Sequence, residues 1–269
     1  MADGEGSGNS GAPTPITVDV GGHALCVRIV GEGPTVVLES GGSGQGVGAW
    51  GRDLERMLAE RATVVTYDRA GVGRSGGTQA ATVTEAADGL HRLVHALGLE
   101  LPAVFLGWSY GGLVTQVHAA RHPEDVSGLV FVDPTAAGTP PGPGPVRRLS
   151  FGAVSRTLRL RAAFGGPNAQ ELRELATVLA GMPQAMEETA RVRREVGLPP
   201  VPVRVVTAGR RPRMPRAHLE HLDADHRALA EQSPQGRVAV AERAGHQIPH
   251  EQPEAVLQAL DEVLEATRA

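Results

Sequence analysis

The chain lacks several features that define other classes of protein. Its 269 residues include a single cysteine, Cys26, so an intramolecular disulfide is excluded, and we interpret this thiol as buried and inert. No apolar run approaches the length of a membrane-spanning helix, so we expect no membrane segment. Aromatic residues make up only 3% of the chain, so we expect an aliphatic core rich in alanine.

An excess of charge of one sign is also missing. The formal net charge is −4, and acidic residues follow the arginine-rich stretches, so we expect neither a nucleic-acid surface nor a membrane partner. Residues 1–15 are rich in glycine and serine and lack the basic and apolar regions of a signal peptide, which predicts a disordered tail. We therefore expect a cytoplasmic protein, and the composition leaves its oligomeric state open.

What the chain does contain is a G-x-S-x-G sequence at residues 107–111, between a predicted strand and a predicted helix. The strand is apolar, and the helix has apolar residues three to four positions apart until Pro123. A strand-to-helix turn this sharp strains its central residue, here Ser109, and leaves almost no room for side chains two positions before and after it. The two outer glycines of the motif meet this requirement, so we expect the Ser109 hydroxyl to stand clear of the sheet at the positive end of a helix.

Apolar segments along the chain predict a mostly parallel, eight-stranded sheet flanked by helices on both faces. The predicted strands are residues 16–20, 23–29, 35–38, 63–67, 101–106, 126–132, 201–207 and 237–240, and the predicted helices between and after them include 49–60, 83–97, 215–232 and one from Pro253. Gly21-Gly22 between the first two strands is a hairpin signal. The alternation breaks over residues 135–199, which begin rich in proline and glycine and continue with helical spacing. We expect a core domain of residues 16–134 and 200–269, with residues 135–199 inserted as a helical cap.

Four marks along the chain, in this order and spacing, resemble the α/β-hydrolase family. They are the Ser40-Gly41-Gly42 loop, residues 68–75, residues 107–111, and Gly245-His246 before the last helix. The chain order of serine, acid and histidine is also that of the family. The resemblance covers residues 16–134 and 200–269 and implies the α/β-hydrolase fold. It says little about the substrate, because such proteins differ most in their caps.

The resemblance implies a base for the serine. A hydroxyl is a poor nucleophile, so Ser109 needs a base within hydrogen-bond distance. His246, in the loop after the last strand, has the position of the family's catalytic histidine. His250, four residues on, is the rival candidate.

The acid is harder to place. Many relatives carry it after the strand before the last one, but here residues 206–211 contain no carboxylate. Some hydrolases of this fold carry the acid one strand earlier, at the position of Asp133, which follows a predicted parallel strand at the edge where such sites form. We therefore assign Asp133 the role of orienting His246 and stabilising its imidazolium. The alternatives are Glu220, Asp223 and Asp225.

Acyl transfer also needs donors for the developing oxyanion, and the family supplies two backbone N–H groups. One is that of the residue after the nucleophile, here Tyr110. The other comes from the loop after the third strand, where the resemblance places Gly42, and glycine permits close backbone approach. Asp68 and Arg69 belong to a turn that is more often structural in this family, and we assign them no catalytic role.

The remaining histidines indicate no site. We interpret His218, His221 and His226 as part of an exposed polar helix face rather than as metal ligands. We interpret His118 and His122 as packing or surface residues. His23, His91 and His95 carry no signal. We expect neither a metal nor an organic cofactor.

Together these features predict a serine hydrolase that acts on a small-molecule substrate, cleaving an ester, thioester or lactone through an acyl-enzyme. The same residues would serve carbon–carbon bond hydrolysis, cofactor-free perhydrolysis or a biosynthetic cyclisation. Dehalogenases and epoxide hydrolases are disfavoured because those relatives have an aspartate where this chain has Ser109. A non-catalytic small-molecule receptor on the same fold is the second alternative.

Overall fold

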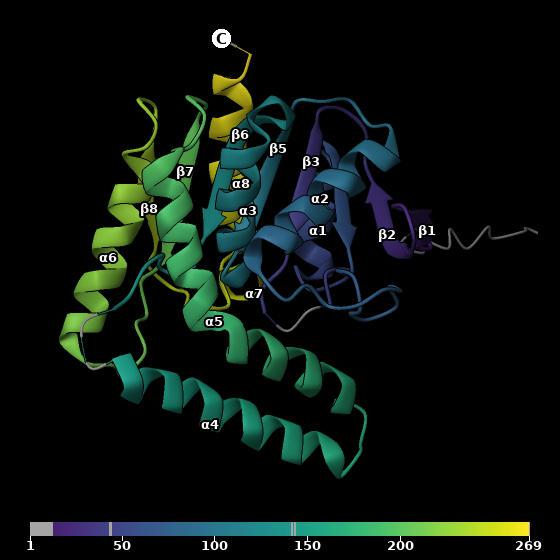
Figure 1. The fold of residues 1–269 in the computed structure, drawn as a ribbon. Helices are drawn as coiled ribbons and strands as arrows, with labels where there is room; N and C mark the ends of the chain where they lie inside the picture. Colours follow the sequence, from purple (N-terminus) through teal and green to yellow (C-terminus); the bar gives the residue numbers. More distant parts are fainter. Residues whose placement is uncertain (1–12, 43–44, 141, 143, 269) are drawn as a thin grey trace, which may run out of the picture.

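The computed structural model describes residues 13–42, 45–140, 142 and 144–268. The predicted tail at residues 1–15 lies almost entirely outside this range. Within it, eight strands form one sheet in the order β1-β2-β4-β3-β5-β6-β7-β8 (Figure 1). The strands are β1 (Ile16–Asp19), β2 (Ala24–Val30), β3 (Thr35–Glu39), β4 (Thr63–Tyr67), β5 (Ala103–Trp108), β6 (Val126–Val132), β7 (Val203–Ala208) and β8 (Arg237–Ala241).

The sheet is parallel except at one edge. Strand β2 pairs antiparallel with both β1 and β4, and the other neighbours pair in parallel. Gly21 and Gly22, with φ of 86° and 91°, form the turn between β1 and β2 that the sequence predicts. Each strand begins and ends within two residues of its predicted bounds, which confirms the mostly parallel, eight-stranded sheet.

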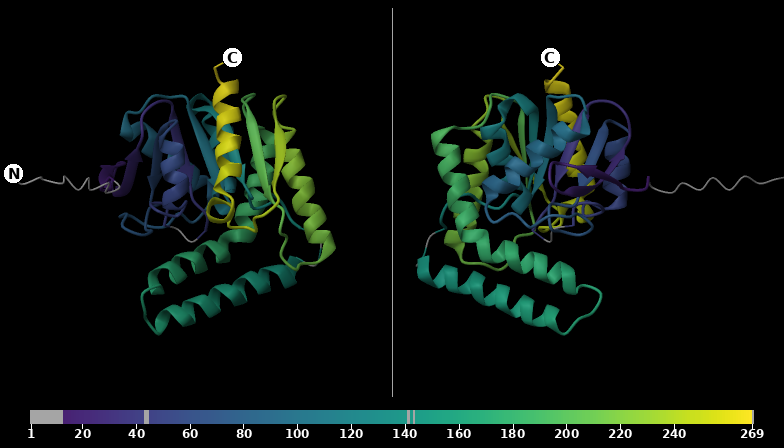
Figure 2. Two further views of the ribbon diagram at one scale, coloured as in Figure 1. Left: turned by 180° about the vertical axis from the view of Figure 1, so that it is seen from behind. Right: turned by 45° about the vertical axis from the view of Figure 1, so that its right-hand side comes forward.

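Helices cover both faces of this sheet (Figures 1 and 2). The helical segments are α1 (Arg52–Ala59), α2 (Val83–Leu97), α3 (Tyr110–Arg121), the 3-10 turn η1 (Pro123–Asp125), α4 (Gly144–Ala163), α5 (Ala169–Glu195), α6 (Arg216–Ala230), α7 (Ile248–Glu251) and α8 (Pro253–Ala266). On one face α2, α3, α6 and part of α5 bury a core around Phe105 and Phe131. On the other face α1 and α8 bury a second core around Trp50. Both cores consist mainly of valine, leucine and alanine.

Local signals explain where α2 begins and ends. The Thr82 side chain accepts a hydrogen bond from the Glu85 backbone N–H, and the Glu85 carboxylate accepts one from the Ala81 N–H. These reciprocal bonds satisfy donors that the first helical turn leaves free. The helix ends at Gly98, whose φ of 61° is open to glycine at little cost. The first and last residues of α2 are therefore set by its own sequence.

Two long helices separate β6 from β7. Helix α4 and the first part of α5 lie beyond the carboxyl ends of the strands, below the sheet in Figure 1 and in both views of Figure 2. Helix α5 contains Pro183, and its second half packs along α3. The side of α5 toward the sheet buries Val178 and Met182, whereas Leu160 near the end of α4 and Phe164 directly after α4 are exposed. In the described chain no helix combines the length and the apolar character that a membrane crossing requires.

Candidate active site

Ser109 lies in the sharp turn that joins β5 to α3. Its φ of 54° and ψ of −119° are rare for a residue with a side chain. A Cβ atom on Gly107 would lie 2.7 Å from Thr115 Oγ1, and one on Gly111 would lie 2.3 Å from the Glu39 carbonyl oxygen. Both flanking positions therefore exclude side chains, for the reason that the sequence indicates.

The structure brings Ser109, His246 and Asp133 together from three separate loops. The His246 Nε2 atom lies 3.0 Å from Ser109 Oγ, and its Nδ1 atom lies 2.7 Å from Asp133 Oδ2. An ionised carboxylate only accepts hydrogen bonds, so Nδ1 carries the proton and Nε2 is left to accept the serine hydroxyl. This is the tautomer in which an imidazole can remove a proton from an alcohol.

Asp133 follows β6 directly, in a strained conformation with a φ of 39°. It is 8% exposed, and its Oδ1 atom accepts a hydrogen bond of 3.0 Å from the Ala208 N–H. Burial raises the pKa of Asp133, but the hydrogen bonds from His246 and Ala208 outweigh burial, so this pKa lies below its ordinary value. The carboxyl group is therefore ionised at neutral pH.

The rival residues have other partners. The His250 Nε2–H donates to the Ala49 carbonyl oxygen at 2.9 Å. The three alternative acids each pair with an arginine, and these pairs are Glu220 with Arg216, Asp223 with Arg211, and Asp225 with Arg193. Among the described carboxylates, Asp133 is the one bonded to the His246 ring.

Trp108 fixes the loop that carries His246. Its indole Nε1–H donates to the His246 carbonyl oxygen at 3.0 Å. Its ring packs against that of Trp50, with 5.9 Å between the centroids and an angle of 57° between the ring planes. A second bond runs from the Gly245 N–H to Glu251 Oε2 at 2.8 Å. Sequence reasoning missed the role of Trp108, since the motif leaves that position free.

The loop after β3 lies beside the serine. A Cβ atom on Gly41 would lie 3.6 Å from Ser109 Cβ, and one on Gly42 would lie 3.1 Å from Val178 of α5. Arg69 donates hydrogen bonds to the carbonyl oxygens of Ser40 at 2.8 Å and Gly41 at 2.7 Å. In a trans peptide the C=O and the next N–H point in opposite directions, so the Gly42 N–H points away from Arg69.

Arg69 belongs to a buried network. Its guanidinium lies 2.5 Å from Glu39 Oε1, and Tyr67 donates its hydroxyl to the same carboxylate. Burial raises the pKa of Glu39, while Arg69 and Tyr67 oppose that shift. The neighbouring Asp68 accepts backbone hydrogen bonds from Gly46 and other loop residues. The turn is structural, and Arg69 holds the carbonyl groups that precede Gly42, a role that the sequence did not indicate.

Tyr110 connects Ser109 to a cavity of about 650 Å³. As the first residue of α3, it has no partner for its backbone N–H within the helix. Its side chain lines the cavity together with apolar residues of α2 and α5, whereas Ser109 and His246 are not among the described lining residues. The Arg69 guanidinium lies 5.3 Å from the centroid of the Tyr110 ring. The cavity is therefore one residue away from the serine and mostly apolar.

The prediction for His226 is wrong. It was expected on an exposed helix face, but it is 1% exposed, where α6 packs on β7. Its Nε2–H donates to the Pro134 carbonyl oxygen at 2.9 Å, and its Nδ1 atom lies 3.0 Å from Thr207 Oγ1. Burial lowers the pKa of His226. The prediction failed because the spacing of residues on a helix does not indicate which side of the helix packs against the sheet.

Comparisons with known proteins identify the family and the fold of the chain. The model of the alpha/beta hydrolase family matches residues 36–259. The chain is 34% identical over 175 residues to a pimeloyl-(acyl-carrier protein) methyl ester esterase of Chromobacterium violaceum, a match that covers 64% of each protein. It is 38% identical over 116 residues, 42% of its length, to 5% of the polyketide synthase ThaQ of Burkholderia thailandensis. The chain thus spans less than two thirds of the length of these curated relatives.

A solved structure extends the likeness to almost the whole chain. A thermophilic esterase from Thermogutta terrifontis superposes with a TM-score of 0.73, covering 96% of this chain and 100% of its own, at 22% identity. At that identity the likeness concerns the fold.

Proposed function

The chain belongs to the alpha/beta hydrolase family, and from that premise we propose that it is a serine hydrolase that cleaves an ester, thioester or lactone. The observation that carries the proposal is the pair of hydrogen bonds at His246, 3.0 Å to Ser109 and 2.7 Å to Asp133. A hydroxyl, an imidazole and an ionised carboxylate in this order form the arrangement that generates a serine nucleophile. The esterase named among the relatives supports the same reaction class.

The reaction proceeds in two halves. Ser109 Oγ attacks the carbonyl carbon while His246 Nε2 takes the hydroxyl proton, and Asp133 stabilises the imidazolium. The carbonyl oxygen becomes an oxyanion that accepts hydrogen bonds from the backbone N–H groups of Gly42 and Tyr110. The intermediate collapses as the imidazolium protonates the leaving alcohol or thiol, which leaves an ester of Ser109. Water, deprotonated by His246, then attacks that ester, and the imidazolium returns the proton to Ser109 Oγ as the acid leaves.

We propose that residues 135–199 act as a cap and that the acyl group lies in the apolar cavity. Helix α4 and the first part of α5 lie over the carboxyl ends of the strands, and Val178 of α5 approaches Gly42. A cavity of about 650 Å³ falls in the range of small-molecule sites. We propose a small-molecule substrate with an aliphatic acyl group. The cytoplasmic location stays a prediction.

Labelling with a fluorophosphonate tests the proposal. We expect one adduct per chain, located on Ser109 by peptide mass spectrometry, because only an activated serine reacts. Ser109→Ala should abolish labelling and lower kcat for p-nitrophenyl butyrate by roughly 10⁴- to 10⁶-fold. Ser127→Ala, near the start of β6, is the matched control, and this variant should be labelled and should turn over the ester as the native chain does. Folded protein that resists the reagent and binds esters without turnover would instead favour a receptor.

A further inference from the structure

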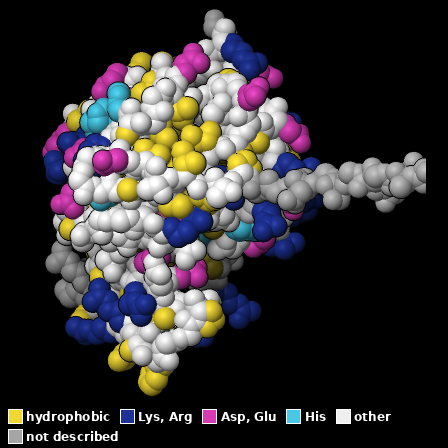
Figure 3. All heavy atoms as spheres, turned by 90° about the vertical axis from the view of Figure 1, so that its right-hand side faces the viewer, with side chains coloured by type: hydrophobic (Ala, Val, Ile, Leu, Met, Phe, Trp, Pro, Cys, Tyr) yellow, Lys and Arg dark blue, Asp and Glu magenta, His cyan; other side chains and the backbone are white. Residues whose placement is uncertain are grey.

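Four histidines lie together far from the proposed catalytic residues. Two are on α2, one is on α3, and one follows α3 directly. The two of each pair are four residues apart, a spacing that places residues on one side of a helix. Helices α2 and α3 pack against each other, so the two faces meet. Successive rings lie with centroids 3.8 to 6.4 Å apart. The residues are His91, His95, His118 and His122. Figure 3 shows one face of the molecule, with histidine side chains in cyan.

A buried carboxylate faces two of these rings. Asp125, in η1, is 1% exposed. Its Oδ2 atom lies 2.8 Å from His91 Nδ1, and its Oδ1 atom lies 2.9 Å from His95 Nε2. Among the described residues, every hydrogen bond or ion pair of the Asp125 side chain comes from a histidine, and no arginine neutralises it. A buried carboxylate without a permanent cation is costly, so this one suits a bound metal ion.

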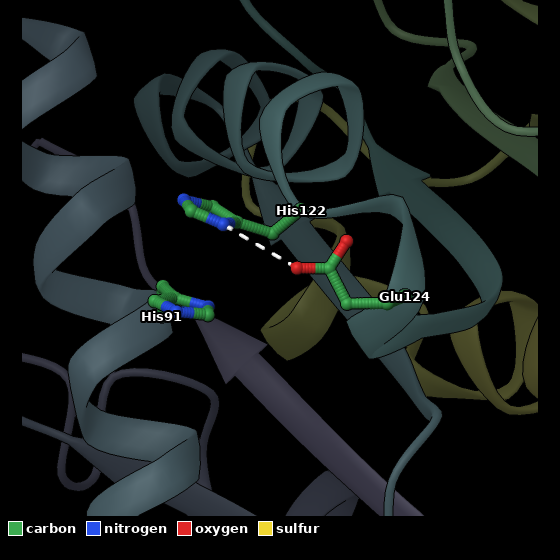
Figure 4. Close-up of side chains that lie close together, drawn as sticks. All are labelled: His91, His122 and Glu124. Atoms are coloured by element: carbon green, nitrogen blue, oxygen red, sulfur yellow. Dashed lines mark ion pairs between the residues drawn. The ribbon is translucent and has the colours of Figure 1, made fainter.

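A second set of ligands overlaps with the first. Figure 4 shows His91 and His122 face to face, with Glu124 beside His122. The two rings are 3.8 Å apart and inclined by only 11°. The lone pair of an imidazole nitrogen lies in the plane of its ring, so two parallel stacked rings cannot direct their nitrogens at one ion. The rings of His91 and His95 are inclined by 59°, which permits convergence on Asp125.

We propose that His91, His95 and Asp125 bind a divalent transition-metal ion of the zinc type. Two imidazole nitrogens and a carboxylate are ligands that Zn²⁺ accepts, with water completing a tetrahedron. Across such an ion the ligand atoms are about 3.4 Å apart. The present separations of 2.8 and 2.9 Å are hydrogen bonds, so the ion replaces the bridging protons and the cluster opens by about half an ångström.

The surroundings allow this small opening. The side chains of His91 and His95 are 31% and 51% exposed, so their rings can turn and an ion can enter from solvent. Each neutral imidazole moves its proton to the other ring nitrogen when the first binds the ion, so no oxidant or further reactant is needed. The ion links α2 to the start of β6. The site lies at the opposite end of β6 from Asp133, so it stabilises the fold rather than joining in hydrolysis.

Isothermal titration of zinc chloride into the full-length, tag-free chain, first dialysed against EDTA, tests the proposal. We expect one Zn²⁺ per chain and a rise of roughly 5 °C in the melting temperature at a large excess over the dissociation constant. His95→Ala and Asp125→Asn should each weaken binding at least tenfold. His218→Ala, a histidine on α6, is the matched control and should bind as the native chain does.

Several outcomes would overturn the site. The native chain binding no Zn²⁺ is one, and equal affinity in His95→Ala is another. A larger loss in His122→Ala than in His95→Ala would place the ion on the second set instead. The half-exposed His95 can change without unfolding the chain, so the test stands even where Asp125→Asn does not fold. Replacement by Co²⁺ gives an independent readout, since tetrahedral coordination should produce visible absorption that disappears in His95→Ala.

Discussion

The two ends of β6 carry the same pair of residue types in different settings. Asp125 precedes the strand and Asp133 follows it, about 26 Å away for a strand of this length. Each carboxylate is buried and accepts a hydrogen bond of 2.7 to 2.9 Å from a histidine. At one end the imidazole faces a serine hydroxyl, and at the other the carboxylate meets a second imidazole. A His–Asp pair therefore indicates no function by itself, because the third group decides between proton transfer and metal binding.

Asp133→Asn gives the largest test of this contrast. We expect kcat for p-nitrophenyl butyrate to fall by about 10⁴-fold, because an amide in place of the carboxylate favours the wrong tautomer of His246. Zinc affinity, measured by titration, should stay within twofold of native, since the ion is proposed at the other end of β6. A variant that keeps a tenth or more of native turnover would remove Asp133 from the reaction.

The end of β6 that carries Asp133 also differs from the other end in having a proposed oxyanion donor nearby, and Arg69→Lys tests the role of Arg69 in positioning that donor. The lysine keeps a positive charge beside Glu39 but cannot bridge the carbonyl groups of Ser40 and Gly41. We expect kcat to fall by roughly 10- to 100-fold with KM nearly constant, because an oxyanion donor loses its position. The exposed Arg74→Lys is the control. A loss confined to KM would show that Arg69 acts on substrate binding.

The apolar cavity is a further feature of the region of the proposed catalytic residues. Gly181 of α5 lines this cavity, so a larger side chain at that position would fill part of it. A Cβ atom at this position would meet nothing within 4 Å. Gly181→Leu should therefore lower kcat/KM for p-nitrophenyl octanoate about tenfold more than for the acetate, because the side chain occupies acyl space. Gly181→Ala should change both esters equally. Equal losses in the leucine variant would place the acyl group elsewhere.

The smallest expected effect is on stability and concerns His226. This buried histidine is held by a carbonyl oxygen and a hydroxyl group, whereas the histidines at the two ends of β6 are held by a carboxylate. Burial lowers its pKa from 6.5, so the unfolded chain binds a proton that the folded chain does not as the pH falls below 6.5. The free energy of unfolding should fall by up to about 1.4 kcal/mol per pH unit in this window. Urea unfolding of His226→Gln should show a shallower pH dependence. Parallel curves for the two proteins would contradict the assignment.

Much of the proposed catalytic region could be anticipated from local rules. The glycines around Ser109 exclude Cβ atoms at contacts of 2.3 to 2.7 Å, a demand that the G-x-S-x-G spacing already implies. Asp133 and His246 came instead from the resemblance to the family, which carries its acid and its histidine in the loops after these strands. The histidine cluster could not be anticipated in the same way. The four-residue spacings from His91 to His95 and from His118 to His122 are visible in the sequence, but the contact with Asp125 depends on how α2 and α3 pack.

What the sequence by itself determined is the mostly parallel, eight-stranded sheet and the strained turn at Ser109. Both follow from interactions between near neighbours: alternating apolar runs, and glycines where a side chain cannot fit. Only the tertiary structure decided that Asp133 meets His246 across 113 residues, that Arg69 holds the loop before Gly42, and that His226 is buried. Contacts between distant segments depend on sheet order and helix packing, which no local spacing specifies.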